Sequence, residues 1–588
     1  MYRTNTCREL TAKDEGKTVT LSGWVHRRRD HGGLIFIDLR DRYGLTQVVF
    51  DPKFNKESHA TAEDVRPEYV LKVTGEVRKR IEGQANPNMK TGEIEIYINE
   101  IEILNESKTP PFEIDQEKDV NEELRLKYRY LDLRHDRMRN NIILRHKMIK
   151  EIRDFMDKEG FLEIETPILI KGTPEGSREY LVPSRLYPGK FFVLPQSPQQ
   201  LKQMLMIAGF DKYFQIARCF RDEDQRGDRQ PEFTQLDMEM SFVEEKDVMK
   251  VNEDLLIDLT KKFAPDKKIM KTPFPVMSYK EVMDTYGSDK PDIRFELPIV
   301  DITDIVKNSK FGVFKNAVIN NGVVKALLVN NIADWPRGDL DKLEELAKIH
   351  GAKGLAYFVY KEGEIKSPIT KFLSEKEIDE ITKKTGAKTG DIVFFSADEY
   401  VTACESLGQV RLECGRKLDL IDENVFAYLW INEFSMFEKK KDGQIDTVHH
   451  PFTRPSDEDK KLLESKPEDA KAIAYDIVLN GCEIGGGSIR IHEQSLQQKI
   501  FDILKITPED AEMRFGHMLE AFSYGAPPHG GIAWGLDRLV MLFAGEPNIR
   551  EVIAFPKDQK AKDLTLGAPS VIPKKDVAEA NVKIINTN

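Results

Sequence analysis

The stretch FRDEDQRGDRQPEFTQLD (residues 220–237), read together with HGGIAWGLDRL (residues 529–539), decides the fold of this chain. The first stretch predicts an arginine near the end of one strand, a charged loop, and a returning strand that carries an aromatic residue. The second predicts a strand of small residues that leads into a helix with Arg538 in its first turn. A site that holds ATP in a bent conformation needs these features: an arginine at the α-phosphate, an aromatic ring under the adenine and a second arginine at the far phosphate.

In this order, the two stretches strongly resemble motifs 2 and 3 of the class II aminoacyl-tRNA synthetases. The resemblance implies two catalytic arginines: Arg221, which would bridge the α-phosphate and the amino-acid carboxylate, and Arg538, which would bind the γ-phosphate. Phe233 would stack on the adenine. The other ATP-binding residues that the resemblance implies are Asp222, Glu223, Gln230, Glu483, Gly535, Leu536 and Asp537.

Composition sets broad limits on the protein class. A chain of 588 residues is too long for one hydrophobic core, so we expect three or four domains. No apolar run reaches the ~20 residues of a membrane span, and the first residues lack an apolar signal segment. The five cysteines are scattered without a C-x-x-C pair, so we expect reduced thiols, a soluble cytoplasmic protein and no structural zinc. The net charge of −12 alone argues against nucleic-acid binding, which a local basic patch has to override.

The first 105 residues predict a five-stranded barrel of OB type, because five short apolar-alternating runs are separated by glycine or polar clusters. These runs are residues 18–27, 33–40, 45–50, 68–77 and 93–104. Arg27 and Arg29, Phe36 and Gln47 offer the cations, the stacking ring and the amide that a single-stranded RNA loop requires. A solvated basic loop and a core phenylalanine are the alternative. Beside the synthetase motifs, the barrel resembles the class IIb anticodon-binding domain, in which Phe36 would stack on the middle anticodon base and Gln47 would hydrogen-bond it.

Residues 106–140 are polar, contain two adjacent prolines and then become basic, which is typical of a hinge beside the RNA. Apolar residues at helical spacing follow over residues 141–159, and then the strand FLEIETPIL (residues 161–169) with Pro167 inside it. This helix, strand and proline resemble class II motif 1, which builds the homodimer interface. An ordinary helix and edge strand fit the same residues equally well.

The segment TPEGSREYLVP (residues 173–183) has the glycine and proline content of a mobile loop. It resembles the lid that closes over the amino acid in aspartyl enzymes, and Glu175 would then meet the substrate ammonium. A surface turn is the alternative.

Two candidate cations favour aspartate as the substrate. Lys202, in QSPQ-x-x-K, and Arg490, in GGGSIRIH, could both face a side-chain carboxylate, and a bidentate arginine rejects the neutral amide analogue. A solvated helix lysine is the plain interpretation of Lys202 alone. However, the segment stands where the aspartyl family has its aspartate-binding segment, with Gln199 and Asp237 on the α-ammonium and His449 near the carboxylates. The aspartate-binding residues implied are Glu175, Gln199, Gln200, Leu201, Lys202, Arg221, Asp237, His449 and Arg490.

Asp476 and Glu483 flank a predicted turn in YDIVLNGCEIGGG (residues 475–487). If they face each other across a hairpin, they can share Mg²⁺, which prefers oxygen ligands and keeps water and phosphate as the others. The glycine run lets the backbone approach a ligand closely, although a bulged strand would explain it as well.

The sequence therefore predicts a multi-domain α+β protein with an antiparallel-sheet catalytic core flanked by helices. An α+β segment between the two ATP motifs resembles the insertion domain of bacterial-type aspartyl enzymes, and the C-terminal residues predict a surface extension. The expected regions are a barrel (1–105), a hinge (106–140), a first core segment with motifs 1 and 2 (141–295), the insertion (296–422), a second core segment with motif 3 (423–556) and the extension (557–588).

Taken over nearly the whole chain, the motifs resemble the bacterial-type aspartyl-tRNA synthetases. This implies a ligase that activates L-aspartate with ATP and Mg²⁺ and charges tRNA-Asp, as a homodimer without a membrane partner. A synthetase that makes free asparagine would not need the barrel. A non-catalytic RNA-binding regulator would be expected to lose Arg221, Glu483 or Arg538, and all three are present.

Two positions in the barrel correlate with tRNA choice in that family, and here they are His31 and Gly83. This pair resembles the non-discriminating enzymes, which also charge tRNA-Asn. Gly83 has no side chain to exclude either third anticodon base. If both are plain loop residues, the enzyme would be strict for tRNA-Asp.

Overall fold

The computed structural model describes residues 1–114, 120–172, 177–440 and 443–585. The chain forms two compact units, Met1–Arg139 and Asn140–Asn588, which are described separately. Within the described ranges, no helix is long and apolar enough to cross a membrane.

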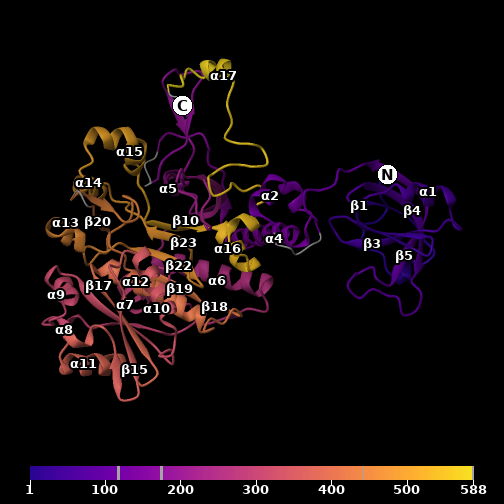
Figure 1. Cartoon of the computed structure of the whole chain (residues 1–588). Coiled ribbons are helices and arrows are strands. Elements are labelled where there is room, and N and C mark those ends of the chain that lie inside the picture. Colours follow the sequence, from indigo (N-terminus) through magenta and orange to yellow (C-terminus); the bar gives the residue numbers. More distant parts are fainter. Residues whose placement is uncertain (115–119, 173–176, 441–442, 586–588) are drawn as a thin grey trace. The chain divides into compact units, whose positions relative to one another are not determined.

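The first unit contains the five-stranded closed barrel that the sequence predicts, with strand order β1-β2-β3-β5-β4 (indigo in Figure 1). Alternate residues of each strand face inward, and Leu21, Ile37 and Ile96 are among the fully buried ones. The strand β1 ends at His31, later than predicted, because it continues to pair with β2 up to the hairpin. The barrel elements are η1 (Ala12–Asp14), β1 (Thr18–His31), β2 (Leu34–Arg40), β3 (Leu45–Phe50), α1 (Lys56–Glu63), β4 (Val70–Lys79) and β5 (Ile94–Asn105).

The predicted hinge contains two short helices, α2 (Glu122–Lys127) and α3 (Arg129–Asp132). Asn121 begins α2, because its side chain accepts hydrogen bonds from the backbone of the first turn. Helix α4 (Asp136–Lys158) then begins five residues before the predicted start at residue 141.

The second unit is built on an eight-stranded sheet in the order β12-β19-β22-β23-β24-β10-β9-β6. Its central strands are antiparallel, and the two end pairs, β12 with β19 and β6 with β9, are parallel. The strands are β6 (Leu162–Glu163), β9 (Lys212–Phe220), β10 (Glu232–Ser241), β12 (Val276–Ser278), β19 (Tyr428–Asn432), β22 (Ala474–Leu479), β23 (Cys482–Ile489) and β24 (His529–Gly535).

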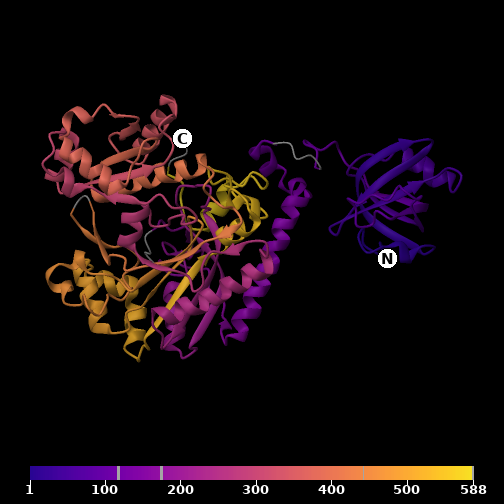
Figure 2. The ribbon, with the colours of Figure 1, turned by 90° about the horizontal axis from the view of Figure 1, so that it is seen from below.

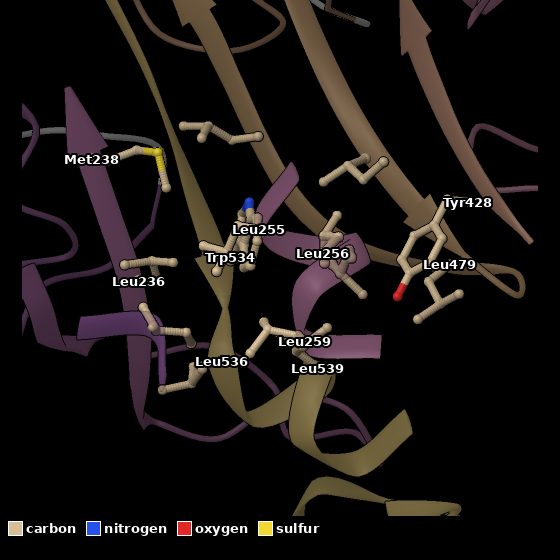
Figure 3. Packing of buried hydrophobic residues seen from close by; sticks show 14 of the residues in the cluster. Leu236, Met238, Leu255, Leu256, Leu259, Tyr428, Leu479, Trp534, Leu536 and Leu539 are labelled. Atoms are coloured by element: carbon tan, nitrogen blue, oxygen red, sulfur yellow. The ribbon is translucent and has the colours of Figure 1, made fainter. Parts of the chain in front are cut away.

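One face of this sheet is apolar and is covered by helices. Along β10, Leu236 and Met238 point into the same core as Trp534 of β24. Helices α4 and α6 (Glu245–Phe263) lie along this face (Figure 2), and Figure 3 shows leucines of α6 directed toward Trp534 and its neighbours. Because side chains alternate along a strand, the residues between these apolar positions lie on the opposite face.

The predicted strand over residues 161–169 is wrong in length. Strand β6 contains only Leu162 and Glu163 at the edge of the sheet, and Pro167 lies beyond it. Proline cannot donate a ladder hydrogen bond, so the chain leaves the sheet, and the backbone N–H of Thr166 bonds to Gln215 Oε1 at 3.2 Å instead.

The region that the sequence assigns to an insertion has its own five-stranded sheet, β13-β14-β17-β15-β16. Apolar residues on its two faces form separate cores, one with α10 and α12 and the other with α8, α9 and α11. The bounds are β13 (Ile299–Asp301), α8 (Thr303–Val306), α9 (Gly312–Ile319), β14 (Val323–Val329), α10 (Arg337–Ile349), β15 (Ala356–Lys361), β16 (Glu364–Lys366), η2 (Thr370–Phe372), α11 (Glu375–Thr385), β17 (Ile392–Asp398) and α12 (Tyr400–Lys417).

The other elements of this unit surround the large sheet. They are β7 (Leu181–Pro183), β8 (Phe191–Val193), α5 (Gln199–Ile207), β11 (Lys268–Ile269), α7 (Tyr279–Tyr286), β18 (Val425–Phe426), β20 (Phe437–Lys439), β21 (Ile445–Thr447), α13 (Leu462–Ser465), η3 (Pro467–Asp469), α14 (Gln494–Ile503), α15 (Pro508–Phe522), α16 (Leu536–Ala544), η4 (Ile549–Val552) and α17 (Lys574–Glu579).

The C-terminal residues are not a surface extension from their start. The amide of Gln230 and the backbone of Lys557 bond to each other in both directions, at 2.7 and 3.1 Å. The Lys557 ammonium also lies 2.8 Å from Glu232 at the start of β10. This segment therefore fastens the returning strand of the first motif, whereas most residues after Leu566 are exposed.

Candidate active site

Two adjoining cavities open on the polar face of the eight-stranded sheet. The outer cavity lies beside the loop between β9 and β10, and the inner cavity, of about 320 Å³, lies beside α5. Four residues line both cavities, so the two are in direct contact: Arg221, Gln235, Glu483 and Ala533.

The inner cavity is lined by buried charges of both signs. Lys202 Nζ lies 2.9 Å from Asp237 and 3.2 Å from Glu239. Arg490 grips Glu239 with two hydrogen bonds, Nε to Oε1 at 2.9 Å and Nη2 to Oε2 at 3.2 Å. The two predicted cations therefore converge on one carboxylate, Glu239, which the sequence reasoning missed. Its place two residues after Asp237, on the same face of β10, is the signal that could have identified it.

The ion pairs control ionisation here. Burial raises the pKa of Asp237, although Lys202 opposes this. Burial also acts on Glu239, but Arg490 and Lys202 together hold the pKa of that carboxyl below its ordinary value. The Asp237 Oδ1 atom has no hydrogen-bond partner among the described residues, and Asp237 is one of the residues that line the inner cavity.

The Lys202 ammonium already has three acceptors for its three N–H groups: Asp237, Glu239 and the carbonyl oxygen of Met238 at 3.4 Å. Arg490 has one donor to spare. Its Nη1 donates to Ser488 Oγ at 2.5 Å and to His450 Nε2 at 2.7 Å. With the two bonds to Glu239, four of the five guanidinium N–H groups are used within the described chain.

The predicted aspartate-binding residues on α5 lie on two different faces of the helix. Gln199 and Lys202, three residues apart, share one face of the helix and line the inner cavity. Gln200 and Leu201 are absent from the lining, because the helix turns them away from it. The Oε1 atom of Gln200 instead accepts a hydrogen bond from His517 Nε2 at 2.7 Å.

Two neighbouring histidines contact this cavity, of which only His449 was predicted. Burial and the nearby Arg490 lower the pKa of His449 to about 4, and its ring stands edge-on to Phe434. His450 is also held neutral, since burial and Arg490 lower its pKa well below the ordinary value. A neutral Nε2 can accept the hydrogen bond from Arg490.

Arg221 and Phe233 meet in the outer cavity. The guanidinium carbon of Arg221 lies 5.1 Å from the centre of the Phe233 ring, and Glu223 and Gln230 belong to the same lining. Asp222 was predicted to bind ATP, but it is exposed and absent from the lining. Neighbouring residues in an extended segment point in opposite directions, so Asp222 faces away from the cavity.

The start of α16 contributes Arg538 to the outer cavity. Its Nη1 donates to the carbonyl oxygen of Glu483 at 2.9 Å, and its Nη2 lies 3.1 Å from Asp228, which was not predicted. Gly535 and Asp537 are also in the lining. Leu536 is not in the lining, and its side chain is fully buried in the helix-covered core.

Asp537 holds three segments together behind the outer cavity. One carboxylate oxygen accepts the backbone N–H of Thr234 at 2.8 Å, and the other binds Arg145 of α4. The Arg145 guanidinium also donates to Thr234 Oγ1 at 3.0 Å. The carboxylate therefore fixes the strand that carries Phe233.

Asp476 and Glu483 are not directly opposite each other in the β22–β23 hairpin. Asp476 pairs with Gly486 and Glu483 pairs with Val478. Asp476 and Val478 are two residues apart on β22 and share a face, so Glu483, opposite Val478, lies on the same face as Asp476. A β-bulge at this point shifts the register by one residue and places Gly486 opposite Asp476. Burial and the charge of Glu483 raise the pKa of Asp476 well above its ordinary value.

Gly486 is required by this arrangement, since a Cβ atom there would lie 2.6 Å from Asp476 Oδ1. Within the described ranges no group of three potential metal ligands occurs, so a divalent ion here would need further ligands from a bound molecule. Glu175 lies outside the described residues. The nearby Ser177 hydroxyl donates to Gln196 Oε1 at 2.6 Å.

The predicted RNA-reading residues lie together on the outer face of the barrel. A bulge between Val25 and Arg27 places Arg27 opposite Asp38 and Arg29 opposite Phe36. Arg29 donates to Asp38 at 2.8 Å and to Gln47 at 3.2 Å. The partner of the Gln47 amide, Glu95 at 2.9 Å, was missed. Phe36 is half-buried rather than exposed.

His31 and Gly83 are both exposed. Gly83 has a φ of +82°, a conformation that favours glycine, and a Cβ atom there would meet no atom within 4 Å. The backbone conformation therefore explains a glycine at position 83, in addition to the predicted need for space beside the third anticodon base.

Comparisons with known proteins agree with both the barrel and the catalytic core. A family model described as tRNA synthetases class II (D, K and N) matches residues 121–559, and one described as OB-fold nucleic acid binding domain matches residues 19–104. The chain is 52% identical over 586 residues to the "Aspartate--tRNA(Asp/Asn) ligase" of Thermoanaerobacter pseudethanolicus, covering 99% of this chain and 98% of the relative. It is 51% identical over 585 residues to the protein of the same name from Syntrophomonas wolfei, covering 99% and 100%.

Solved structures show the same fold at low identity. An asparaginyl-tRNA synthetase from Pyrococcus horikoshii, complexed with asparaginyl-adenylate, has a TM-score of 0.58 at 20% identity, covering 94% of this chain and 97% of its own. An aspartyl-tRNA synthetase from Entamoeba histolytica has a TM-score of 0.57 at 19% identity, covering 94% and 91%.

Proposed function

The chain belongs to the class II tRNA synthetases of the aspartate, lysine and asparagine group, and from this premise we propose that it is an aspartate–tRNA ligase. It activates L-aspartate with ATP and transfers the aspartyl group to the 3′-terminal adenosine of tRNA-Asp and tRNA-Asn. The observation that carries this proposal is the buried Arg490 in an inner cavity that shares Arg221 with the outer one.

The inner cavity suits aspartate at both ends of the molecule. The remaining N–H group of Arg490 can bind the side-chain carboxylate, whereas the amide of asparagine would point donors at a donor. The unpaired Asp237 Oδ1 and the Gln199 side chain can accept hydrogen bonds from the α-ammonium. Lys202 acts behind these groups, since its charge favours the ionised forms of Asp237 and Glu239.

The outer cavity suits ATP. Phe233 offers a ring face for the adenine, with Glu223, Gln230 and Gly535 around the nucleotide. Arg221, in the wall between the two cavities, is the group that can reach both the α-phosphate and the aspartate α-carboxylate. Arg538 is placed for the γ-phosphate, and its pairing with Asp228 keeps its side chain extended before ATP binds.

Asp476 and Glu483 fit a divalent cation such as Mg²⁺, because two acidic side chains on one cavity face repel each other until a cation neutralises them. When bound beside ATP, Mg²⁺ would reduce the negative charge on the phosphates.

Two steps complete the reaction. The aspartate α-carboxylate oxygen attacks the α-phosphorus, the bond from this phosphorus to the bridging oxygen breaks, and pyrophosphate leaves. The ribose 3′-hydroxyl of the terminal adenosine then attacks the acyl carbon, and AMP leaves. Arg221 stabilises charge on the α-phosphate in both steps, so catalysis is mainly positioning and electrostatics.

The outer face of the barrel is proposed to read the anticodon. Arg27 and Arg29 would attract the phosphates, Phe36 would stack on the middle base, and Gln47 would hydrogen-bond its edge. His31 and Gly83 leave space for either third base, which supports charging of tRNA-Asn as well. The names of the relatives agree with this dual use.

We also propose that two copies associate through the edge of the sheet at β6. Exposed apolar side chains gather there, including Leu162, Ile168 and Leu169. Residues 296–422, with their own sheet and cores, form the proposed insertion domain.

Aspartate-dependent exchange of labelled pyrophosphate into ATP tests the choice of amino acid. With Mg²⁺ present, exchange is expected with L-aspartate. Asparagine and lysine should stay at background, because neither has a side-chain carboxylate for Arg490 to bind. Equal exchange with asparagine would contradict the proposal.

A further inference from the structure

Behind Gln199, the fully buried side chains of Gln203 and His529 form a chain of hydrogen bonds that ends at a backbone carbonyl oxygen. We call this chain the relay. The Gln199 Nε2 atom donates to Gln203 Oε1 at 3.1 Å. The Gln203 Nε2 atom lies 3.1 Å from His529 Nε2, and His529 Nδ1 lies 2.7 Å from the carbonyl oxygen of Pro527. Gln203 and His529 are both 0% exposed, and neither belongs to the lining of the inner or the outer cavity.

The chemistry of the partners gives this relay a single direction. A carbonyl oxygen only accepts, so His529 Nδ1 carries the proton and its Nε2 is an acceptor. Gln203 must therefore place its NH₂ group toward His529 and its oxygen toward Gln199. Burial lowers the pKa of His529, which agrees with a neutral ring.

The relay fixes how Gln199 faces the inner cavity. With one N–H of its NH₂ group held by Gln203, the Gln199 side chain has a fixed orientation and keeps its oxygen free to accept a new hydrogen bond. Turning the amide over would put its oxygen against the oxygen of Gln203, with both groups buried. Together with Asp237 Oδ1, Gln199 then offers a second pure acceptor, and an ammonium is a pure donor.

We propose that Gln203 and His529 are positioning residues that lock the Gln199 amide with its oxygen toward the α-ammonium of aspartate. This inference rests on the proposed function, since it assumes aspartate in the inner cavity. The inference adds two residues that do not contact the substrate and yet set the affinity for the α-ammonium of aspartate.

The test is the Gln203→Met variant, measured by aspartate-dependent pyrophosphate exchange. Without an acceptor at position 203, the Gln199 amide can rotate, so KM for aspartate should rise about tenfold or more, while KM for ATP and kcat stay within about twofold. Asn252→Leu is the control: it also removes a fully buried side-chain amide, but on α6 at the helix-covered face of the sheet and outside both cavities. It should leave KM for aspartate within about twofold.

A double-mutant cycle separates positioning from general packing. In a Gln199→Ala background, adding Gln203→Met should cause no further rise in KM for aspartate, because the amide that the relay orients is gone. A further rise of the same size as in the wild-type background would overturn the relay.

Variants at His529 keep the test valid if Gln203→Met fails to fold. His529→Gln retains an acceptor in place of Nε2 and should keep KM for aspartate within about threefold, whereas His529→Leu should show the full loss. Equal values for these two variants would overturn the relay. If the wild-type protein itself showed no aspartate-dependent exchange, the proposed function would fail, and the relay with it.

Discussion

Replacing Arg490 by alanine should reduce aspartate-dependent pyrophosphate exchange by at least about 10³-fold, while binding of ATP is retained. Removing one partner of a buried ion pair costs about 3–5 kcal/mol, and here the loss leaves Glu239 with Lys202 alone and the substrate carboxylate without its arginine. The proposed ATP site is the other cavity, and Arg490 is not in its lining. Exchange kinetics and equilibrium binding of an ATP analogue measure the two effects separately.

Loss of one of the two cations that contact the buried Glu239 weakens folding, so a second variant is needed. Arg490→Ala combined with Glu239→Gln removes the buried negative charge along with the positive one, and it should still fail to activate aspartate. Arg514→Ala, at an exposed position on α15, is the matched arginine control and should keep wild-type exchange. If Arg490→Ala exchanged as fast as the wild type, the assignment of the carboxylate-binding group would be wrong.

Replacing Arg221 by alanine is expected to lower kcat for exchange by about 10²–10³-fold, with smaller changes in both KM values. Removing one preorganised donor from a developing charge typically has this effect. Arg221 lies in the wall between the cavities and contacts Phe233, so it is placed to act on the reacting atoms rather than on one end of either substrate.

The control for Arg221 is Arg226→Ala, in the same loop between β9 and β10. Arg226 is exposed and absent from both cavity linings, so exchange without tRNA should be unchanged. Equal losses in the two variants would show that the loop needs positive charge in general, and would contradict a specific role for Arg221.

Much of this arrangement could be predicted from local patterns. Period-two alternation identified the five barrel strands, and small residues followed by a helix start identified β24 and α16. The converging cations Lys202 and Arg490 could also be predicted, because a buried positive charge needs a partner. These features depend on residues close in the sequence or on simple charge pairing.

The features that could not be predicted depend on strand register and on the direction in which side chains point. A single sequence does not contain this information. The bulge next to Ile477, which places Gly486 rather than Gly485 opposite Asp476, inserts one residue without any marked change in pattern. Asp222 and Leu536 sit inside the right motifs but point away from the cavity. Glu239, 251 residues from Arg490, became recognisable as its partner only when the sheet brought β10 and β23 to opposite sides of β24.

Charging of two purified transcripts, tRNA-Asp with anticodon GUC and tRNA-Asn with anticodon GUU, tests the central claim most directly. With labelled aspartate, ATP and Mg²⁺, comparable charging of both is the predicted result, because His31 and Gly83 leave space for either third base. Charging of tRNA-Asp alone would make these two positions ordinary loop residues of a strict enzyme. Charging of neither transcript by folded protein would contradict the assignment of this chain as an aspartate–tRNA ligase.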